Sequence, residues 1–91
     1  MRVLHLTIKK PWFDLIASGE KREEYRELKP YWHKRLDKDY DVVQFRNGYT
    51  KSSPTCLIEL QEVLIGLGII EWGAPAGQRV YILKLGKILS R

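Results

Sequence analysis

Alternating apolar positions mark β-strands at both ends of this chain. Near the beginning, Leu4, Leu6 and Ile8 occupy every second position, and a period of two places side chains on one face of a strand. Residues 79–89 alternate as well, but in the first half of this segment apolar side chains fall on both faces. That pattern is typical of a strand in the middle of a sheet or of one that closes a barrel.

Two more strands are predicted in the second half of the chain. Val43 and Phe45 share the apolar face of a strand over 41–46. The longest pattern, 55–65, changes the parity of its apolar positions in its second half, which predicts a β-bulge or a bend. The single cysteine, Cys56, falls on the apolar face of this strand, where we expect a small buried side chain rather than a nucleophile.

Two short helical patterns each begin with a proline, which suits the first turn of a helix because its missing N–H is not needed there. Pro11 opens a helix over about 11–18, in which Trp12 and Ile16 lie on one face. Pro30 opens a second helix, with a tryptophan and a leucine one turn apart. The order strand, helix, strand, helix and three strands predicts one α+β domain over residues 1–91.

A charged segment follows the first helix. Gly19 stands where a helix ends on a left-handed residue, and residues 20–27 have no apolar stripe, which favours an extended strand over a helix. Most charged runs are solvated faces, and charges on an edge strand also prevent unwanted pairing. The residues alone therefore favour a solvated edge strand over a polar cleft.

Strand geometry nevertheless allows part of this segment to converge. Alternate residues of a strand share a face, and the residues of the even face are Arg22, Glu24 and Arg26. Lys21 lies beside the turn, so its long stem can reach the same face. The segment would then bring two or three cations and one carboxylate to one place.

Composition favours anionic partners without demanding them. The formal net charge is +5, from 16 basic and 11 acidic residues spread along the chain. Nucleic acid and phosphorylated small molecules are the partners that such a charge permits. No signal sequence or membrane-spanning segment is apparent, so we expect a cytoplasmic protein without a membrane partner. We expect no cofactor and no metal, because no histidine or cysteine is spaced near His5 to complete a site.

Five stretches together resemble the ASCH domain family, which is related to the PUA domains of RNA-modification proteins. The central one is Gly19-x-Lys21-x-x-Glu24-x-Arg26, which is similar to the family signature. The others are Lys9-Lys10-Pro11-Trp12-Phe13 with Lys29-Pro30-Tyr31-Trp32, Phe45-Arg46-Asn47-Gly48-Tyr49, and Glu71-Trp72-Gly73-Ala74-Pro75. The likeness is to small stand-alone bacterial and phage members and covers nearly the whole chain.

The resemblance implies a small PUA-like β-barrel of about five strands with two flanking helices. It also implies a cleft between the first helix and the barrel that binds RNA or a nucleotide, with Lys21, Glu24 and Arg26 contacting the ligand. Added to the pattern of charges, it makes the cleft the preferred interpretation of the charged strand.

Two further groups are candidate ligand contacts. Lys9 and Lys10 lie at the start of the first helix, where anions are favoured, and Trp12 is either a core residue or, less readily, a surface on which a base stacks. Arg46, Asn47 and Tyr49 surround a strong turn signal. They form either a tight hairpin turn without a ligand or a loop at the mouth of the barrel, and the sequence leaves both open.

Catalysis is the alternative function. The resemblance includes small proteins that hydrolyse the amide of N4-acetylcytidine with a lysine, a threonine and a later glutamate, and a ribonuclease activity is also proposed within the family. Lys21 matches the lysine, but Glu24 replaces the threonine. Glu71 and Glu59 are candidates for the later glutamate by chemistry only. A Lys21 with a pKa lowered by Arg22 or Arg26 could act as a base, although a nearby carboxylate opposes that shift.

A third hypothesis needs no ligand. The charged strand would then form internal salt bridges, Lys21–Glu24 or Glu23–Arg26. Exposed pairs of this kind contribute little stability, so we place this hypothesis last. The oligomeric state is left open by the sequence.

Overall fold

A computed structural model describes all residues, Met1–Arg91. Five strands and two α-helices follow in the predicted order, and a 3₁₀ turn that was not predicted lies before the last strand. Their bounds are β1 (Val3–Thr7), α1 (Lys10–Ala17), β2 (Glu23–Arg26), α2 (Pro30–Arg35), β3 (Val42–Arg46), β4 (Thr55–Leu67), η1 (Ile70–Trp72) and β5 (Arg79–Ser90).

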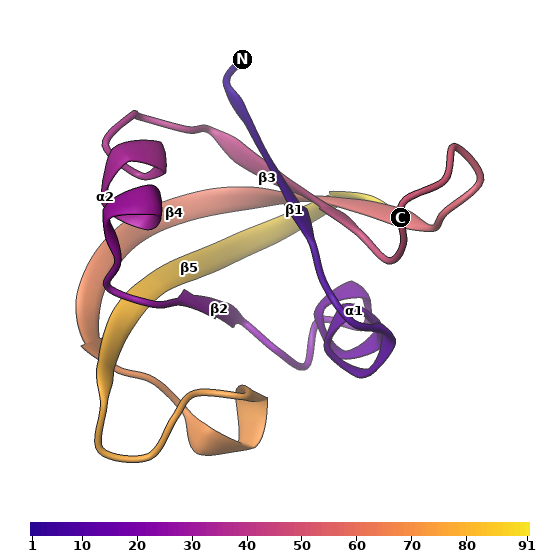
Figure 1. The fold of residues 1–91 in the computed structure, drawn as a ribbon. Helices are drawn as coiled ribbons and strands as arrows, with labels where there is room; N and C mark the ends of the chain where they lie inside the picture. Colours follow the sequence, from indigo (N-terminus) through magenta and orange to yellow (C-terminus); the bar gives the residue numbers. More distant parts are fainter.

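The five strands form one curled sheet in the order β1-β3-β4-β5-β2 (Figure 1). Only β1 and β3 run parallel, and the other neighbours are antiparallel. The sheet curls into a half-barrel, and α1 and α2 lie on either side of β2 (Figure 1). The expected α+β fold, a small barrel-like sheet with two helices, is confirmed.

The long hairpin of β4 and β5 gives the sheet its curl. Its pairing register shifts between Leu57 and Glu62, and such irregularities increase the twist and bend the strand. The bend predicted from the change of parity is therefore present. β5 pairs with β4 on one side and with β2 on the other, which confirms its expected central position.

Two apolar clusters fill the inside of the sheet. The larger lies between the sheet and α1, and it contains Leu4, Leu6, Ile8, Phe13, Ile16, Val43, Phe45, Cys56, Ile58, Leu83 and Leu85. The smaller lies near η1 and contains Tyr25, Ala74, Val80 and Ile82. The alternating positions of β1 and β3 and the buried cysteine are confirmed by the larger cluster. β2 lies beside the smaller one.

Helix α1 ends as its sequence predicts. Its last turn closes with a hydrogen bond of 3.1 Å from the Gly19 amide to the Ile16 carbonyl, and Gly19 adopts a φ of 87°. A side chain at this φ would be strained, so glycine is required. The amide of Lys21 then donates to the Leu15 carbonyl over 2.9 Å. This turn directs the chain from the helix into β2.

The connection between β3 and β4 is longer than a tight hairpin turn. β3 ends at Arg46 and β4 begins at Thr55. The Asn47 amide donates to the Pro54 carbonyl over 3.0 Å, which closes a loop rather than a two-residue turn. The tight-turn interpretation is therefore wrong. Gly48 bends the chain, but residues 47–54 lie between the two strands. This loop lies on the side of the molecule away from α2 (Figure 1).

Candidate functional site

Lys21 is the most unusual side chain of the molecule. Its side chain is only 1% exposed, although lysine is almost never fully buried unless it is paired. Its Nζ donates a hydrogen bond to the Trp72 carbonyl and lies 3.3 Å from Oε1 of Glu24. The rings of Trp12 and Tyr25 are 5.1 and 4.7 Å from Nζ, close enough for cation–π attraction. The buried charge is thus partnered on all sides.

Glu24 connects Lys21 to Arg26. Its side chain is 7% exposed, and its Oε2 lies 2.5 Å from Nη1 of Arg26. Glu24 and Arg26 share one face of β2 because they are two residues apart. Lys21 precedes the strand and reaches the same face through its long stem. The structure therefore brings together the two cations and the carboxylate that the signature suggested.

Burial sets the ionisation of Lys21. Loss of solvation lowers its pKa below the usual value, and the positive charge of Arg26 adds to this effect, while Glu24 acts in the opposite direction. The sequence named Arg22 or Arg26 as the cause. Arg22 instead is exposed, with its guanidinium 3.4 Å from the Leu85 carbonyl, and it plays no part in the shift. That half of the expectation is wrong because Arg22 points out of the cluster.

Arg26 is the most exposed member of this chain of charges. A hollow of about 360 Å³ lies beside it and is lined by Thr7, Ile8, Lys9, Tyr25, Arg26, Glu27 and Trp32. A smaller one of about 150 Å³ is lined by Tyr25, Arg26, Glu27, Gly73, Pro75 and Val80. The Arg26 side chain is 17% exposed, and its guanidinium carbon lies 5.1 Å from the Trp32 ring. Lys21 and Glu24 line neither hollow.

The three candidate residues at the start of α1 have different surroundings. Lys9 lies on the wall of the larger hollow. Lys10 is exposed and pairs with Asp14 at 2.7 Å, one helical turn later. Trp12 packs against the core and holds one face toward Lys21. These contacts agree with the interpretation of Trp12 as a core residue, and its side chain is half-buried.

The three candidates near the β3–β4 loop do not join the charged chain. The side-chain amide of Asn47 donates to the Ile8 carbonyl over 3.0 Å, so it holds a backbone segment on the wall of the hollow. Arg46 donates to the Thr50 carbonyl within the loop. Tyr49 is 91% exposed. Of these three residues, only Asn47 is connected to the hollow. Its side-chain N–H group binds the backbone of Ile8 on the wall.

Neither candidate for a later carboxylate lies in the cluster. Glu71 is exposed on η1, although its neighbour Trp72 binds Lys21. Glu59 is exposed and accepts a hydrogen bond of 2.8 Å from the Lys87 amide. Both assignments lose their basis, because neither carboxylate is buried beside Lys21.

Sequence reasoning missed the role of Glu23. Its Oε1 accepts the hydroxyl of Tyr25 over 2.8 Å, and its Oε2 accepts Nζ of Lys84 over 2.9 Å. The Tyr25 hydroxyl in turn accepts the Ile69 amide over 2.9 Å. This network ties β2 to the segment before η1. The only feature that indicates the Glu23–Lys84 pair is the strand register, which sets the two residues opposite each other. This register is a property of the folded sheet.

Sequence reasoning also missed Trp32. It was expected only as an apolar side chain packing beside Leu36. It does pack against the core, as Leu36 does, but its ring also lies near two guanidinium groups, those of Arg26 and Arg35, at 5.1 and 5.5 Å. The contact with Arg26 joins α2 to the hollow.

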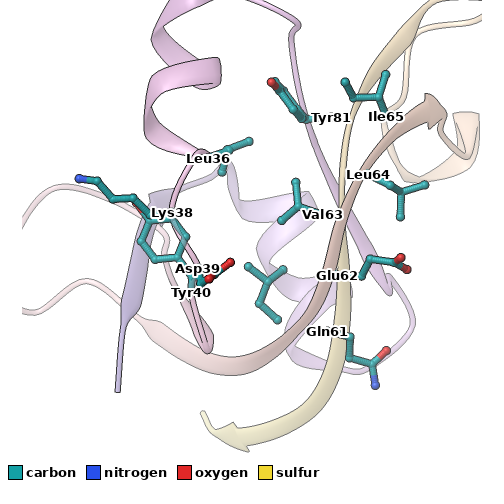
Figure 2. A pocket seen from close by; sticks show the side chains of 11 residues that line it. Leu36, Lys38, Asp39, Tyr40, Gln61, Glu62, Val63, Leu64, Ile65 and Tyr81 are labelled. Carbon is teal, nitrogen blue, oxygen red and sulfur yellow. The ribbon is translucent and has the colours of Figure 1, made fainter.

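The largest hollow of the molecule lies elsewhere. It has a volume of about 520 Å³ between the α2–β3 connection and β4 (Figure 2). Figure 2 shows Leu36, Val63 and Tyr81 around it. Val42 of β3 pairs with Glu59 of β4, and beyond this pair β4 continues beside β5 alone. The hollow fills the space where β3 and β4 separate, and no member of the Lys21–Glu24–Arg26 chain lines it.

Comparison with known proteins found no match: no family model, no curated protein and no solved structure is similar to this chain. No helix has the length and apolar character needed to cross a membrane. No group of three or more histidine, cysteine, aspartate or glutamate side chains is placed to hold a metal ion.

Proposed function

We propose that this chain is a cytoplasmic domain of the ASCH kind that binds RNA or a nucleotide at Arg26. The observation that carries the proposal is the position of Arg26, held by Glu24 and Trp32 on the wall of a hollow of about 360 Å³. Ligand pockets span about 300–1,000 Å³, so this hollow has the size for one small unit such as a nucleoside. The five stretches of sequence resemblance support the same function.

The free donors of Arg26 support an anionic or base-edge ligand. Only its Nη1 donates within the protein, to Glu24 and to the Tyr25 carbonyl. A guanidinium has five N–H donors, so those on Nη2 and Nε remain for a phosphate or for the acceptors of a base. Lys9 adds a second cation at the wall of the hollow. Lys21 has no such freedom, and its role is to hold Glu24 in place.

A titration tests this binding. Cytidine, N4-acetylcytidine and cytidine 5′-monophosphate are added to the labelled protein, and the shifted amide signals are mapped. We expect the shifts to gather at Ile8, Lys9 and Arg26. Arg26→Gln should weaken monophosphate binding about tenfold, because a charge-assisted hydrogen bond contributes about 1.5–3 kcal/mol.

Arg46→Gln is the matched control, since the Arg46 side chain donates to the Thr50 carbonyl of the adjoining loop and not to the hollow, and it should leave the affinity unchanged. Shifts confined to the β3–β4 loop, or an affinity that Arg26→Gln does not alter, would contradict the proposal.

One observation favours a second function, hydrolysis of an N4-acetylcytidine-like amide or of RNA. The lowered pKa of Lys21 makes a larger share of its amine neutral, as a general base requires. Glu24 is close enough to pass on a proton. Substrate would reach Lys21 only after its Nζ leaves the Trp72 carbonyl.

Product analysis separates this activity from binding. Release of acetate from N4-acetylcytidine, or shortened RNA, should be lost in Lys21→Met while the fold is retained. Turnover that survives this substitution removes Lys21 from the mechanism. Binding without any product leaves the binding function alone.

A further inference from the structure

The outer face of α2 carries a second hollow that the proposed site does not use. It has a volume of about 420 Å³ and is lined by Tyr31, Lys34, Arg35, Lys38 and Tyr40. Three cations and two phenols thus form its walls, without a carboxylate. Such a combination suits phosphates and the flat faces of bases.

The cations of this hollow differ in how they are held. Arg35 is fixed, because its Nη2 donates to the His5 carbonyl over 2.5 Å and its Nη1 to the Tyr31 hydroxyl over 3.4 Å. No hydrogen bond or ion pair holds Nζ of Lys34 or Lys38, and both residues are exposed. Their charges are therefore free for a ligand. Tyr31 is 63% exposed and offers a ring to a base.

Trp32 joins this hollow to the one at Arg26. Its ring lies 5.1 Å from the guanidinium carbon of Arg26 and 5.5 Å from that of Arg35. Arg26 lines the first hollow and Arg35 the second. Each hollow is thus lined by an arginine whose guanidinium group lies near the same Trp32 ring, and positive charge continues from one hollow to the other.

We propose that the ligand is single-stranded RNA of two or more nucleotides, which passes from the Arg26 hollow over Trp32 and Arg35 to the outer face of α2. This inference rests on the proposed function, because the first nucleotide occupies the Arg26 hollow. Lys34 and Lys38 bind the phosphates of the following nucleotides, and Tyr31 stacks on a base. An acidic peptide would use the cations but leave the exposed phenol ring without a partner, so RNA fits this surface better.

Binding by oligonucleotides of increasing length tests the path. Cytidine 5′-monophosphate and oligocytidylates of two, four and eight nucleotides are titrated at several salt concentrations. We expect the four-nucleotide oligomer to bind about tenfold or more tightly than the monophosphate. The double variant Lys34→Gln/Lys38→Gln should lose most of that gain and leave monophosphate affinity unchanged. Its log-affinity against log-salt slope should fall by about 1.4, because each phosphate contact with a single strand contributes about 0.7.

Lys87→Gln is the matched control. Lys87 is six residues further along β5 than Tyr81, whose hydroxyl contacts His33 of α2 at 2.5 Å. At about 3.3 Å per strand residue, Lys87 lies about 20 Å away along the strand. This variant removes one cation without touching α2, so oligonucleotide affinity should stay as in the unaltered protein.

The outcomes separate the two proposals. A monophosphate that does not bind, or that binds independently of Arg26, overturns the proposed function. A monophosphate that binds at Arg26 while longer oligomers gain nothing, or gain equally in the double variant, overturns only the RNA path. Polyglutamate that displaces the oligomer from α2 with equal affinity also overturns the path, because the face is then a general polyanion surface.

Discussion

Lys21 holds a charge where the protein offers almost no water. Its partners are a carbonyl, a carboxylate and two aromatic rings. Desolvation disfavours the charged form of a lysine, while an adjacent carboxylate favours it. Burial exceeds the effect of Glu24, so the net shift of the Lys21 pKa is downward.

The first prediction concerns this pKa. In a nuclear magnetic resonance titration of the lysine side chains, Lys21 should lose its proton at a lower pH than the exposed lysines. Arg26→Gln should raise the pKa of Lys21, because it removes a nearby positive charge and leaves Glu24 to Lys21 alone. Arg46→Gln should leave that pKa unchanged. A Lys21 that titrates with the exposed lysines would contradict the burial seen in the structure.

The second prediction concerns Glu24 and stability. Glu24→Gln leaves Lys21 buried without its anion, and removing one partner of a buried pair costs about 3 kcal/mol of unfolding free energy or more at neutral pH. The Lys21 pKa then falls further below its unfolded value of 10.5. The unfolded chain therefore binds this proton more tightly, and stability rises with pH. The deficit of the variant should shrink as the pH approaches 10.5.

Urea unfolding at a series of pH values measures this deficit. Glu27→Gln is the control, because Glu27 forms an exposed pair with Lys29, and exposed pairs contribute about 1 kcal/mol or less. A Glu24→Gln deficit that stays constant or grows with pH would show that the Lys21 proton is not its cause.

At the scale of elements, β2 owes its position to contacts made by side chains on both of its faces. The Glu24 face holds Lys21 and Arg26. On the other face, Tyr25 packs into the smaller apolar cluster and binds the Ile69 amide. β2 is therefore not the solvated edge strand that its composition favours. It is an edge strand whose charges are mostly turned to partners within the protein.

The third prediction tests how closely the segment between β4 and η1 packs on β2. A Cβ built on Gly68 would lie 2.5 Å from Cε1 of Tyr25 and 2.7 Å from Cβ of Ala74. Gly68→Ala should therefore lower the unfolding free energy by about 1–3 kcal/mol, the usual cost of overpacking. Because Tyr25 also lines the hollow at Arg26, the variant should weaken monophosphate binding as well.

Gly66→Ala, two residues earlier at the end of β4, is the matched control. Its Cβ would meet only Cδ1 of Ile82, at 3.5 Å, an ordinary contact. Thermal unfolding of the two variants should differ by several degrees, since about 1 kcal/mol corresponds to about 4–8 °C in a domain of this size. Equal melting temperatures would mean that the Tyr25 side chain can move aside without lowering the unfolding free energy.

At the scale of the whole molecule, the curled sheet makes a compact body around one main core. The radius of gyration is 12.4 Å, close to the value of about 12 Å expected for a folded domain of this length. The core cluster joins residues of β1, α1, β3, β4 and β5. Opening any one of these elements exposes the same core, which favours cooperative unfolding.

The fourth prediction uses the single thiol as a reporter of that unfolding. Cys56 lies in the main cluster at 1% exposure, and burial raises its pKa. Labelling by a thiol reagent should be slowed on the order of a thousandfold or more relative to the denatured chain, since domains of this kind have unfolding free energies of about 5 kcal/mol or more. Mass spectrometry follows the labelled fraction with time. Rapid labelling in native buffer would show that the β4 segment opens locally.

Much of the fold follows from short-range patterns in the chain. Prolines begin both helices, Gly19 ends the first, and alternation identifies the long strands. These signals are local, because a helix turn or a strand face is specified by neighbours within a few residues. The same locality explains why the length of the β3–β4 loop was not predicted. Gly48 permits a turn, but the pairing of β3 with β4 decides where the strands join.

The candidate site depends partly on contacts that local sequence patterns do not specify. The signature brings Lys21, Glu24 and Arg26 to one segment, and that part is a property of sequence. The Trp72 carbonyl that binds Lys21 comes from 51 residues further along the chain. Trp32 reaches Arg26 only because α2 is placed beside β2. Burial of a charge depends on the atoms that exclude water from it, and those atoms are assembled only when the sheet curls. Which residues carry charge was therefore determined by the sequence, while tertiary structure alone decided which of those charges are buried and which face the hollow.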